Sequence, residues 1–127
     1  MQHVKLVFAG SVRGSRSAGG GSFALLTERH HTITRLEFGD GMTAHEAEYD
    51  TLITALEMLS RQVKPAETEV EIQGAGQLVI NQLRGTWKAR DARMQQRLTR
   101  VTELLRQFKG WSITSISPEQ VAAVLQY

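Results

Sequence analysis

The sequence predicts an α/β fold in which a five-stranded mixed sheet is flanked by helices. Three observations predict it. Three β-prone runs follow one another in the first third of the chain, two later β-prone runs each stand between helical segments, and no internal repeat or linker interrupts this order. Strands joined by hairpins form the antiparallel part of such a sheet, and the later strands, each joined to a helix, form the rest. The expected element order is β-β-β-α-β-α-α-β-α.

Length and composition limit the classes of protein that this chain can belong to. Its 127 residues fit one domain, which we expect to span residues 1–127. The 41% hydrophobic and 22% charged residues are typical of a soluble globular protein and exclude a disordered or collagen-like chain. The chain has no cysteine, which excludes disulfides, thiolate metal sites and cysteine nucleophiles. No signal-peptide pattern and no apolar run of about 18 residues occurs, so we expect a cytoplasmic protein without membrane contact.

The first third of the chain predicts a three-stranded antiparallel meander. Val4–Phe8 is apolar and β-prone, as in a buried strand. Ser22–Thr27 and Thr32–Phe38 are two further β-rich runs, and Glu28–His31 is expected to connect them as a hairpin. Gly10–Gly21 contains five glycines, which predicts a loop with much backbone freedom.

Capping signals and apolar spacing predict the helices. Thr43 and Glu46 form a capping-box pattern ahead of a helix over residues 44–61. Two more helices are expected over residues 77–83 and 92–108, and a last one begins after Ser117 with Pro118 in its first turn. Short strands are expected around residues 70–72 and 111–116, between these helices.

Basic residues concentrate in one stretch, although the formal net charge of the chain is only +2. The segment from Arg84 to Lys109 contains eight basic and two acidic residues. Such asymmetry predicts a side of the molecule that faces a polyanion. For Arg93, Arg97 and Arg100, which share one stripe of the expected 92–108 helix, a solvated helix face is the alternative interpretation.

Five collinear strings resemble the ribonuclease H family, particularly its compact reverse-transcriptase-like prokaryotic branch. They are Val7-Phe8-Ala9-Gly10-Ser11 with Arg13-Gly14, then Thr43-Ala44-His45-Glu46-Ala47-Glu48-Tyr49, then Ile72-Gln73-Gly74-Ala75-Gly76-Gln77-Leu78-Val79, then Asn81-Gln82 with Gly85-Thr86-Trp87, and Ile116-Ser117-Pro118-Glu119. The resemblance covers nearly the whole chain and implies a ribonuclease H-like fold. It also implies the family's activity, which is hydrolysis of the RNA strand of an RNA/DNA hybrid at four carboxylates that hold two Mg²⁺ ions.

The chain departs from that family where the metal ligands belong. By resemblance the four carboxylates are expected at Ala9, Glu48, Ala75 and, by ungapped counting from Pro118, Gln126, so only Glu48 is acidic. A Mg²⁺ pair needs several hard oxygen ligands. We therefore expect Glu48 to bind Mg²⁺ weakly or not at all and the chain to carry no cofactor, whereas a functional site would use Mg²⁺. Because these losses are separate, natural degeneration is favoured over engineering.

Residues that could contact nucleic acid remain. The candidates are Gly10, Ser11, Arg13, Gly14, Thr43, Asn81, Arg84, Trp87, Lys88 and Arg90. The first four stand where related enzymes contact RNA 2′-hydroxyls through backbone groups, and Thr43 and Asn81 occupy positions that lie near the hybrid in the family. An aromatic ring among cations suits a nucleic-acid backbone, although packing between two helices is the alternative for Trp87.

Three functions stay open at this point. The favoured hypothesis is a nucleic-acid-binding domain without catalysis, with an RNA/DNA hybrid or duplex RNA as partner. The second is a metal-dependent hybrid endoribonuclease that is disabled by substitution or uses atypical ligands. The third is a protein-interaction scaffold that reuses the fold. The sequence is compatible with a monomer or a homodimer.

Overall fold

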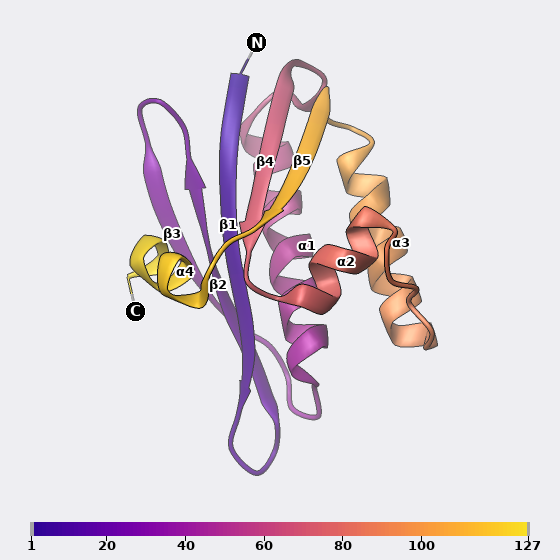
Figure 1. Ribbon diagram of the computed structural model, residues 1–127. Helices are drawn as coiled ribbons and strands as arrows, with labels where there is room; N and C mark the ends of the chain where they lie inside the picture. The colour runs from indigo at the N-terminus through magenta and orange to yellow at the C-terminus, as the bar shows by residue number, and fades with distance from the viewer. Residues whose placement is uncertain (1, 127) are drawn as a thin grey trace.

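A five-stranded mixed sheet in the order β3-β2-β1-β4-β5 forms the centre of the molecule, whose computed structural model describes residues 2–126 (Figure 1). β1 pairs antiparallel with β2 and parallel with β4, β2 pairs antiparallel with β3, and β4 pairs parallel with β5. The predicted sheet and element order are confirmed. The strands are β1 (Gln2–Arg13), β2 (Ala18–Leu26), β3 (His31–Glu37), β4 (Thr68–Gly74) and β5 (Gly110–Ser115).

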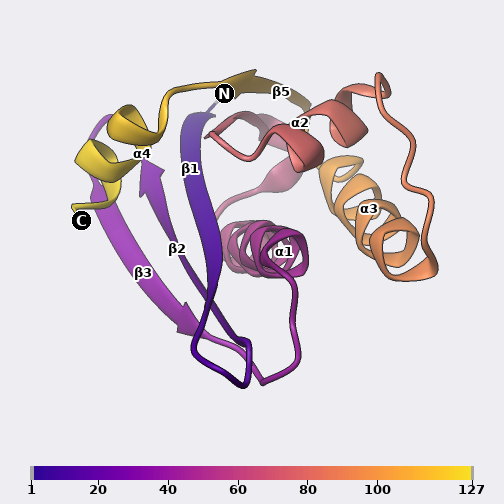
Figure 2. The same cartoon turned by 60° about the horizontal axis from the view of Figure 1, so that its bottom comes forward.

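Helices cover both faces of the sheet (Figure 2). α1 packs against β1 and β2, α3 packs on α1 further from the sheet, and α4 lies on the opposite face. The helices are α1 (Ala44–Gln62), α2 (Gln77–Arg84), α3 (Ala92–Leu105) and α4 (Pro118–Leu125), and a short 3₁₀ turn, η1 (Pro65–Glu67), precedes β4. Within residues 2–126, no helix combines the length and the apolar character that crossing a bilayer requires.

Gly10–Gly21 forms a β-hairpin, and the prediction of a long loop there is wrong. β1 continues to Arg13 and β2 begins at Ala18, so only four residues connect them. A Cβ atom on Gly10 would overlap the backbone of Ala47 and Glu48, and one on Gly21 would overlap the hydroxyl of Thr51. These glycines therefore let the backbone of the sheet approach α1 closely, and what matters at both positions is small size in a strand rather than freedom in a loop.

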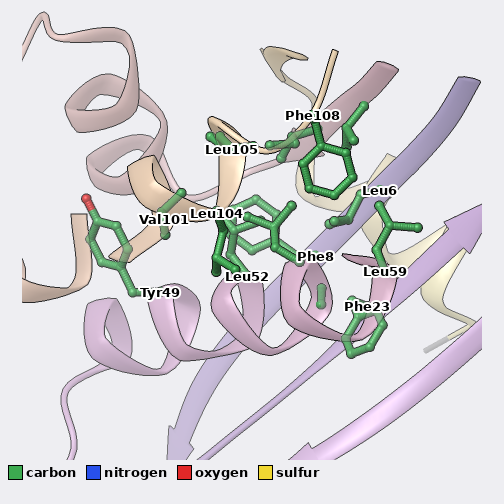
Figure 3. Close-up of a cluster of buried hydrophobic side chains, with 14 of the residues drawn as sticks. Leu6, Phe8, Phe23, Tyr49, Leu52, Leu59, Val101, Leu104, Leu105 and Phe108 are labelled. Carbon is green, nitrogen blue, oxygen red and sulfur yellow. The ribbon is translucent and has the colours of Figure 1, made fainter. Parts of the chain in front are cut away.

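Two apolar clusters hold the layers together. The larger one fills the space between the sheet, α1 and α3, where Phe8, Leu52 and Leu104 meet (Figure 3). The smaller one lies under α4 and joins it to β1 and β2 through four buried side chains, namely Val7, Ala24, Val121 and Leu125. The larger cluster places α1 firmly against β1, which positions the side chains discussed next.

Candidate functional site

One cavity brings together three of the four positions that were expected to carry carboxylates. Its volume is about 220 Å³. The end of β1, the first turns of α1, the loop after β4 and α4 all contribute to its walls. The lining residues are Phe8, Ala9, Gly10, Glu48, Ala75, Gly76 and Val121. Glu48 is the one carboxylate of this lining.

The fourth expected position, Gln126, does not lie at this cavity. Gln126 is the exposed C-cap of α4, in the left-handed region with φ 61°. The residue that α4 brings to the cavity is Val121, on the buried face that it shares with Leu125 four positions later. The apolar i, i+4 pair was visible in the sequence and marks the inner face of the helix better than counting from Pro118 does.

The carboxylate of Glu48 is largely buried, and the described residues compensate its charge only weakly. Its side chain is 15% exposed, and Oε2 has no hydrogen-bond partner within residues 2–126. The nearest cationic group is the half-exposed ring of His45, whose Nδ1 lies 3.8 Å from Oε1. Burial raises the pKa of Glu48, against a smaller opposing effect of His45. Gly76 makes this placement possible, because a Cβ atom there would overlap Oε2.

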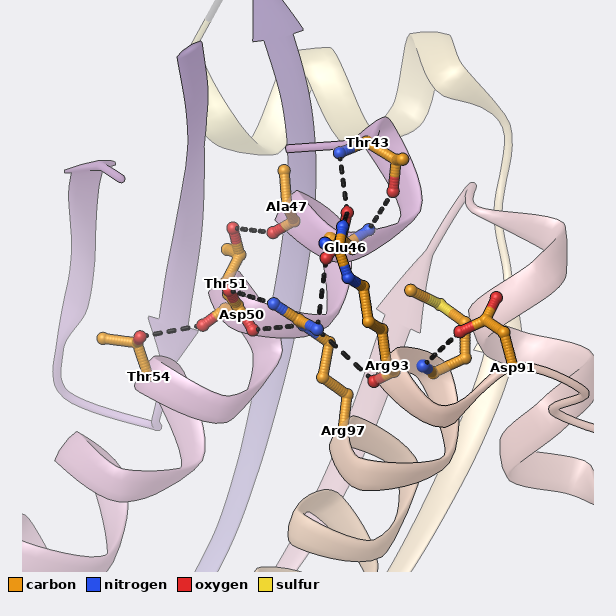
Figure 4. Close-up of polar contacts among 10 residues, drawn as sticks. Thr43, Glu46, Ala47, Asp50, Thr51, Thr54, Asp91, Arg93 and Arg97 are labelled. Atoms are coloured by element: carbon orange, nitrogen blue, oxygen red, sulfur yellow. Dashed lines mark hydrogen bonds and ion pairs between the residues drawn. The ribbon is translucent and has the colours of Figure 1, made fainter. Parts of the chain in front are cut away.

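Glu46, two residues earlier on α1, points to the other side of the helix and is fully satisfied. One of its oxygens accepts a hydrogen bond from the backbone N–H of Thr43, whose hydroxyl accepts from the Glu46 N–H, so the predicted capping box is confirmed. Arg97 and Arg93 reach the carboxylate at 3.3 and 3.6 Å (Figure 4). Burial alone would raise the pKa of Glu46, but the hydrogen bonds from Thr43 and the charges of both arginines bring it below its ordinary value.

The arginine stripe of α3 faces the acids of α1. Arg97 lies 2.8 Å from Asp50 Oδ1 and is only 21% exposed, so neither a solvated face nor a polyanion surface describes it (Figure 4). Arg100 makes a 2.8 Å contact with Glu57 and remains partly exposed. Much of the charge asymmetry in the sequence is therefore neutralised across the α1–α3 interface. Glu46 and Asp50 lie on this α3-facing side of α1 and outside the cavity lining, so neither acid assists Glu48.

The residues around the cavity do not fit a pair of Mg²⁺ ions. Mg²⁺ demands near-octahedral oxygen ligands, several of them commonly from carboxylates and water. Here Ala9, Ala75 and Val121 present apolar groups beside the single carboxylate of Glu48. Nowhere in the described part of the chain do three or more His, Asp or Glu side chains gather in a way that could hold a metal ion.

The expected nucleic-acid contacts near the cavity are spread along β1. Gly10 lines the cavity, whereas Ser11 and Arg13 lie on the exposed end of the strand. Gly14 begins the hairpin turn with φ 71°, a conformation that favours glycine. Gly10 therefore lies beside Glu48 in the cavity lining. Ser11, Arg13 and Gly14 lie progressively further from the cavity, toward the tip of the hairpin.

Three of the expected contacts carry out internal tasks. Thr43 caps α1. Asn81 donates to the carbonyl of Gln77 and accepts from the hydroxyl of Thr86, which fixes the turn after α2. Arg84 donates to the carbonyl of Ile113 on the edge strand β5, at 3.2 Å. These three side chains hold the local backbone in place, and the atoms that make these hydrogen bonds are not free to bind a ligand.

Trp87, Lys88 and Arg90 remain exposed on the segment between α2 and α3. Trp87 is 49% exposed, so packing between the helices accounts for only part of its ring. All three border a groove of about 580 Å³. Its other lining residues are Leu78 and Gln82 of α2, Thr86 and Asp91 of the connecting segment, and Met94 of α3. Neither Lys88 nor Arg90 has a carboxylate within ion-pair distance among residues 2–126. This segment therefore places two cations without an ion-pair contact among the described residues beside an aromatic ring, while the carboxylate of Asp91 in the same lining caps α3.

Comparisons with known proteins agree with this architecture. The family model described as reverse transcriptase-like matches residues 7–126. Ribonuclease HI of Halobacterium salinarum is 39% identical over 74 residues, which are 58% of this chain and 36% of that protein, so the match spans about a third of the relative's length.

Solved structures extend the similarity to nearly the whole chain. The crystal structure of RNase H1 from the halophilic archaeon Halobacterium salinarum superposes with a TM-score of 0.84 at 30% identity, over 94% of this chain and 89% of that one. LC11-RNase H1 in complex with an RNA/DNA hybrid has the same TM-score and coverage at 21% identity, a level that shows a common fold.

Proposed function

The chain belongs to the reverse transcriptase-like family of ribonuclease H domains, and from this membership we propose that it binds an RNA/DNA hybrid or duplex RNA without cutting it. The observation that carries the proposal is the cavity at Glu48, where two alanines and a valine stand around one carboxylate. Such a site keeps the position of the family's chemistry but lacks the ligand set that the chemistry needs.

Loss of the ligand set removes most of the expected catalytic power. Metal ions in a two-metal site clamp the attacking and leaving oxygens and neutralise the charge that develops on them. Preorganised electrostatic stabilisation of this kind is worth several kcal/mol for each group that supplies it. Glu48 alone supplies a negative charge where the transition state needs positive charge, so the cavity does not favour phosphodiester hydrolysis.

Binding requires less than catalysis and has support at two places on the surface. Trp87, Lys88 and Arg90 combine a half-exposed ring with two cations that pair with no carboxylate of residues 2–126, which suits stacking on sugars or bases and contact with phosphates. Gly10 lines the cavity and Ser11 is exposed on β1 just beyond it, so this part of the strand lies where a ribose would approach the cavity. The hybrid bound by the structural neighbour LC11-RNase H1 supports this partner class.

Fluorescence anisotropy with a labelled hybrid, duplex RNA, duplex DNA and single strands tests the binding proposal. We expect hybrid or duplex RNA to bind more tightly than single strands, with an affinity that falls steeply as salt rises. Absence of saturable binding to all four probes at low salt would contradict the proposal and favour an interaction scaffold instead.

Restoring the carboxylates tests the explanation of inactivity. We expect the Ala9→Asp/Ala75→Asp double variant to gain Mg²⁺-dependent cleavage of a hybrid, and addition of Val121→Asp to increase it, because all three positions line one cavity with Glu48. A matched control, Gln126→Asp in the same background, should add nothing, since Gln126 lies outside that lining. Equal gains from Val121→Asp and Gln126→Asp would contradict the placement of α4.

A further inference from the structure

The carboxylate of Glu48 lacks the donors that a buried charge requires. Oε2 makes no hydrogen bond to any described residue, and Oε1 has only the 3.8 Å approach of His45. A buried acceptor without a partner costs free energy, and a buried charge costs more. The other buried glutamate of α1, Glu46, has hydrogen bonds and arginines to satisfy it. The contrast identifies the cavity as a place where a donor is missing.

The walls of the cavity define what kind of donor would fit. Ala9, Ala75 and Val121 offer apolar surface, and the lining supplies one negative charge. A divalent ion with a hydration shell matches neither property, because it needs further oxygen ligands. A singly charged group with an apolar body matches both, since its charge balances one carboxylate and its body covers the apolar walls.

We propose that the cavity at Glu48 binds a short primary alkylammonium ion. The ammonium group donates hydrogen bonds to the Glu48 carboxylate, and the alkyl chain lies against Ala9, Ala75 and Val121. The ammonium meets the carboxylate oxygen that faces the cavity, and the broad last torsion of a glutamate side chain lets the carboxylate adjust to it. The cavity volume of about 220 Å³ limits the ligand to a small amine. This inference does not depend on nucleic-acid binding and is tested without any nucleic acid.

Titration of isotope-labelled protein with n-butylammonium chloride, followed by NMR at constant ionic strength, tests the proposal. We expect saturable shifts concentrated at Ala9, Ala75 and Val121, with an affinity in roughly the millimolar range for a ligand of this size. 1-Butanol is the neutral ligand of matched shape and should bind at least tenfold more weakly. MgCl₂ in the same range should leave these signals unshifted.

Two variants separate a specific site from general attraction of cations to the surface. Glu48→Gln should weaken n-butylammonium binding at least tenfold. Glu119→Gln removes an exposed carboxylate from the first turn of α4, outside the cavity lining, and should leave the affinity unchanged. A spectrum that keeps its dispersion will show that each variant is folded.

Several results would overturn the proposal. These are equal binding of 1-butanol, undiminished binding to Glu48→Gln, shifts spread over the surface without saturation, and stronger binding of Mg²⁺ than of the amine at Ala9 and Ala75. Failure here with intact binding of a hybrid would reject the amine site alone, whereas the reverse pattern would reject the nucleic-acid function alone.

Discussion

The two sides of α1 treat a buried glutamate in opposite ways. On the side that faces α3, Glu46 has two hydrogen bonds with Thr43 and two arginines, and its pKa lies below the ordinary value. On the side that faces the sheet, Oε2 of Glu48 has no hydrogen-bond partner in the described part of the chain, and the pKa of Glu48 lies above the ordinary value. The two residues are only two positions apart, so the difference comes from their surroundings. The contribution of Glu46 to stability is enough to explain why a charged residue is buried there. The buried charge of Glu48 has no such explanation, which points to a role in binding or chemistry.

Among the tests of this comparison, substitution of Arg97 is expected to have the largest effect on stability. Arg97→Met removes the group that lies between Glu46 and Asp50 and leaves Glu46 buried with weaker compensation. We expect a loss of about 2–3 kcal/mol in the free energy of unfolding, somewhat less than for a fully isolated buried charge because Arg93 and Thr43 remain. Urea denaturation measures it. Arg100→Met, which breaks a more exposed pair with Glu57, is the matched control and should cost much less. Equal losses of unfolding free energy in the two variants would show that the burial of Arg97 does not determine its contribution to stability.

A smaller effect of opposite sign is expected on the other side of α1. Glu48→Gln removes an uncompensated buried charge, so we expect the protein to become more stable at neutral pH by about 1 kcal/mol. Thermal and urea unfolding of the two proteins measure the difference. Destabilisation by Glu48→Gln would indicate that the carboxylate has a partner that satisfies it, and the contrast between the two sides of α1 would disappear.

The same two residues predict pH dependences with opposite signs. The pKa of Glu48 is raised in the folded state, so its folded form holds the proton more tightly, and its contribution to stability falls as pH rises from 4.5 through the raised value. The pKa of Glu46 is lowered, so its contribution is present above 4.5 and is lost as pH falls through the lowered value. The gain from Glu48→Gln should therefore shrink on acidification, and the loss from Glu46→Gln should shrink as well, but at lower pH. Unfolding measured between pH 3 and 7 compares the two variants, and coincident profiles would contradict the assignment.

How far the sequence predicts this site depends on whether the relevant contacts are local. The capping box of Thr43 and Glu46 spans three residues and was predicted correctly, as was the position of Glu48 on the helix that follows. Gly10 and Gly21 were misinterpreted as loop residues because their role depends on α1, which lies more than twenty residues further along the chain. Local glycine content cannot distinguish a close approach from a turn.

Two further cases illustrate this limit. The pairing of Arg97 with Asp50 joins positions 47 residues apart, and nothing within the stripe of arginines identifies the acids that will meet it. Counting from Pro118 pointed to Gln126 instead of Val121, because counting along the sequence ignores which face of α4 is apolar and faces inward. The expected nucleic-acid contacts beyond the cavity stay predictions.

The smallest expected effect concerns Lys88 and Arg90, the surface cations that take no part in the ion pairs between α1 and α3. Lys88→Gln and Arg90→Gln should each reduce the salt dependence of hybrid binding by about one unit in the log–log slope, because each removes at most one phosphate contact. Arg93→Gln, whose guanidinium lies 3.6 Å from Glu46, should change the slope less. Anisotropy titrations at several salt concentrations measure the slopes. If Arg93→Gln had the larger effect, the division between paired and free cations would be wrong.

We propose that the protein binds a polynucleotide but does not hydrolyse it, because one glutamate remains where a metal site requires several acids. A single-turnover assay tests this most directly, with excess wild-type protein, a labelled RNA/DNA hybrid and Mg²⁺ or Mn²⁺, and with binding verified in the same tube. We expect a fully bound, uncut RNA strand, and the same result for Glu48→Gln. Metal-dependent cleavage by the wild-type protein that Glu48→Gln abolishes would contradict it.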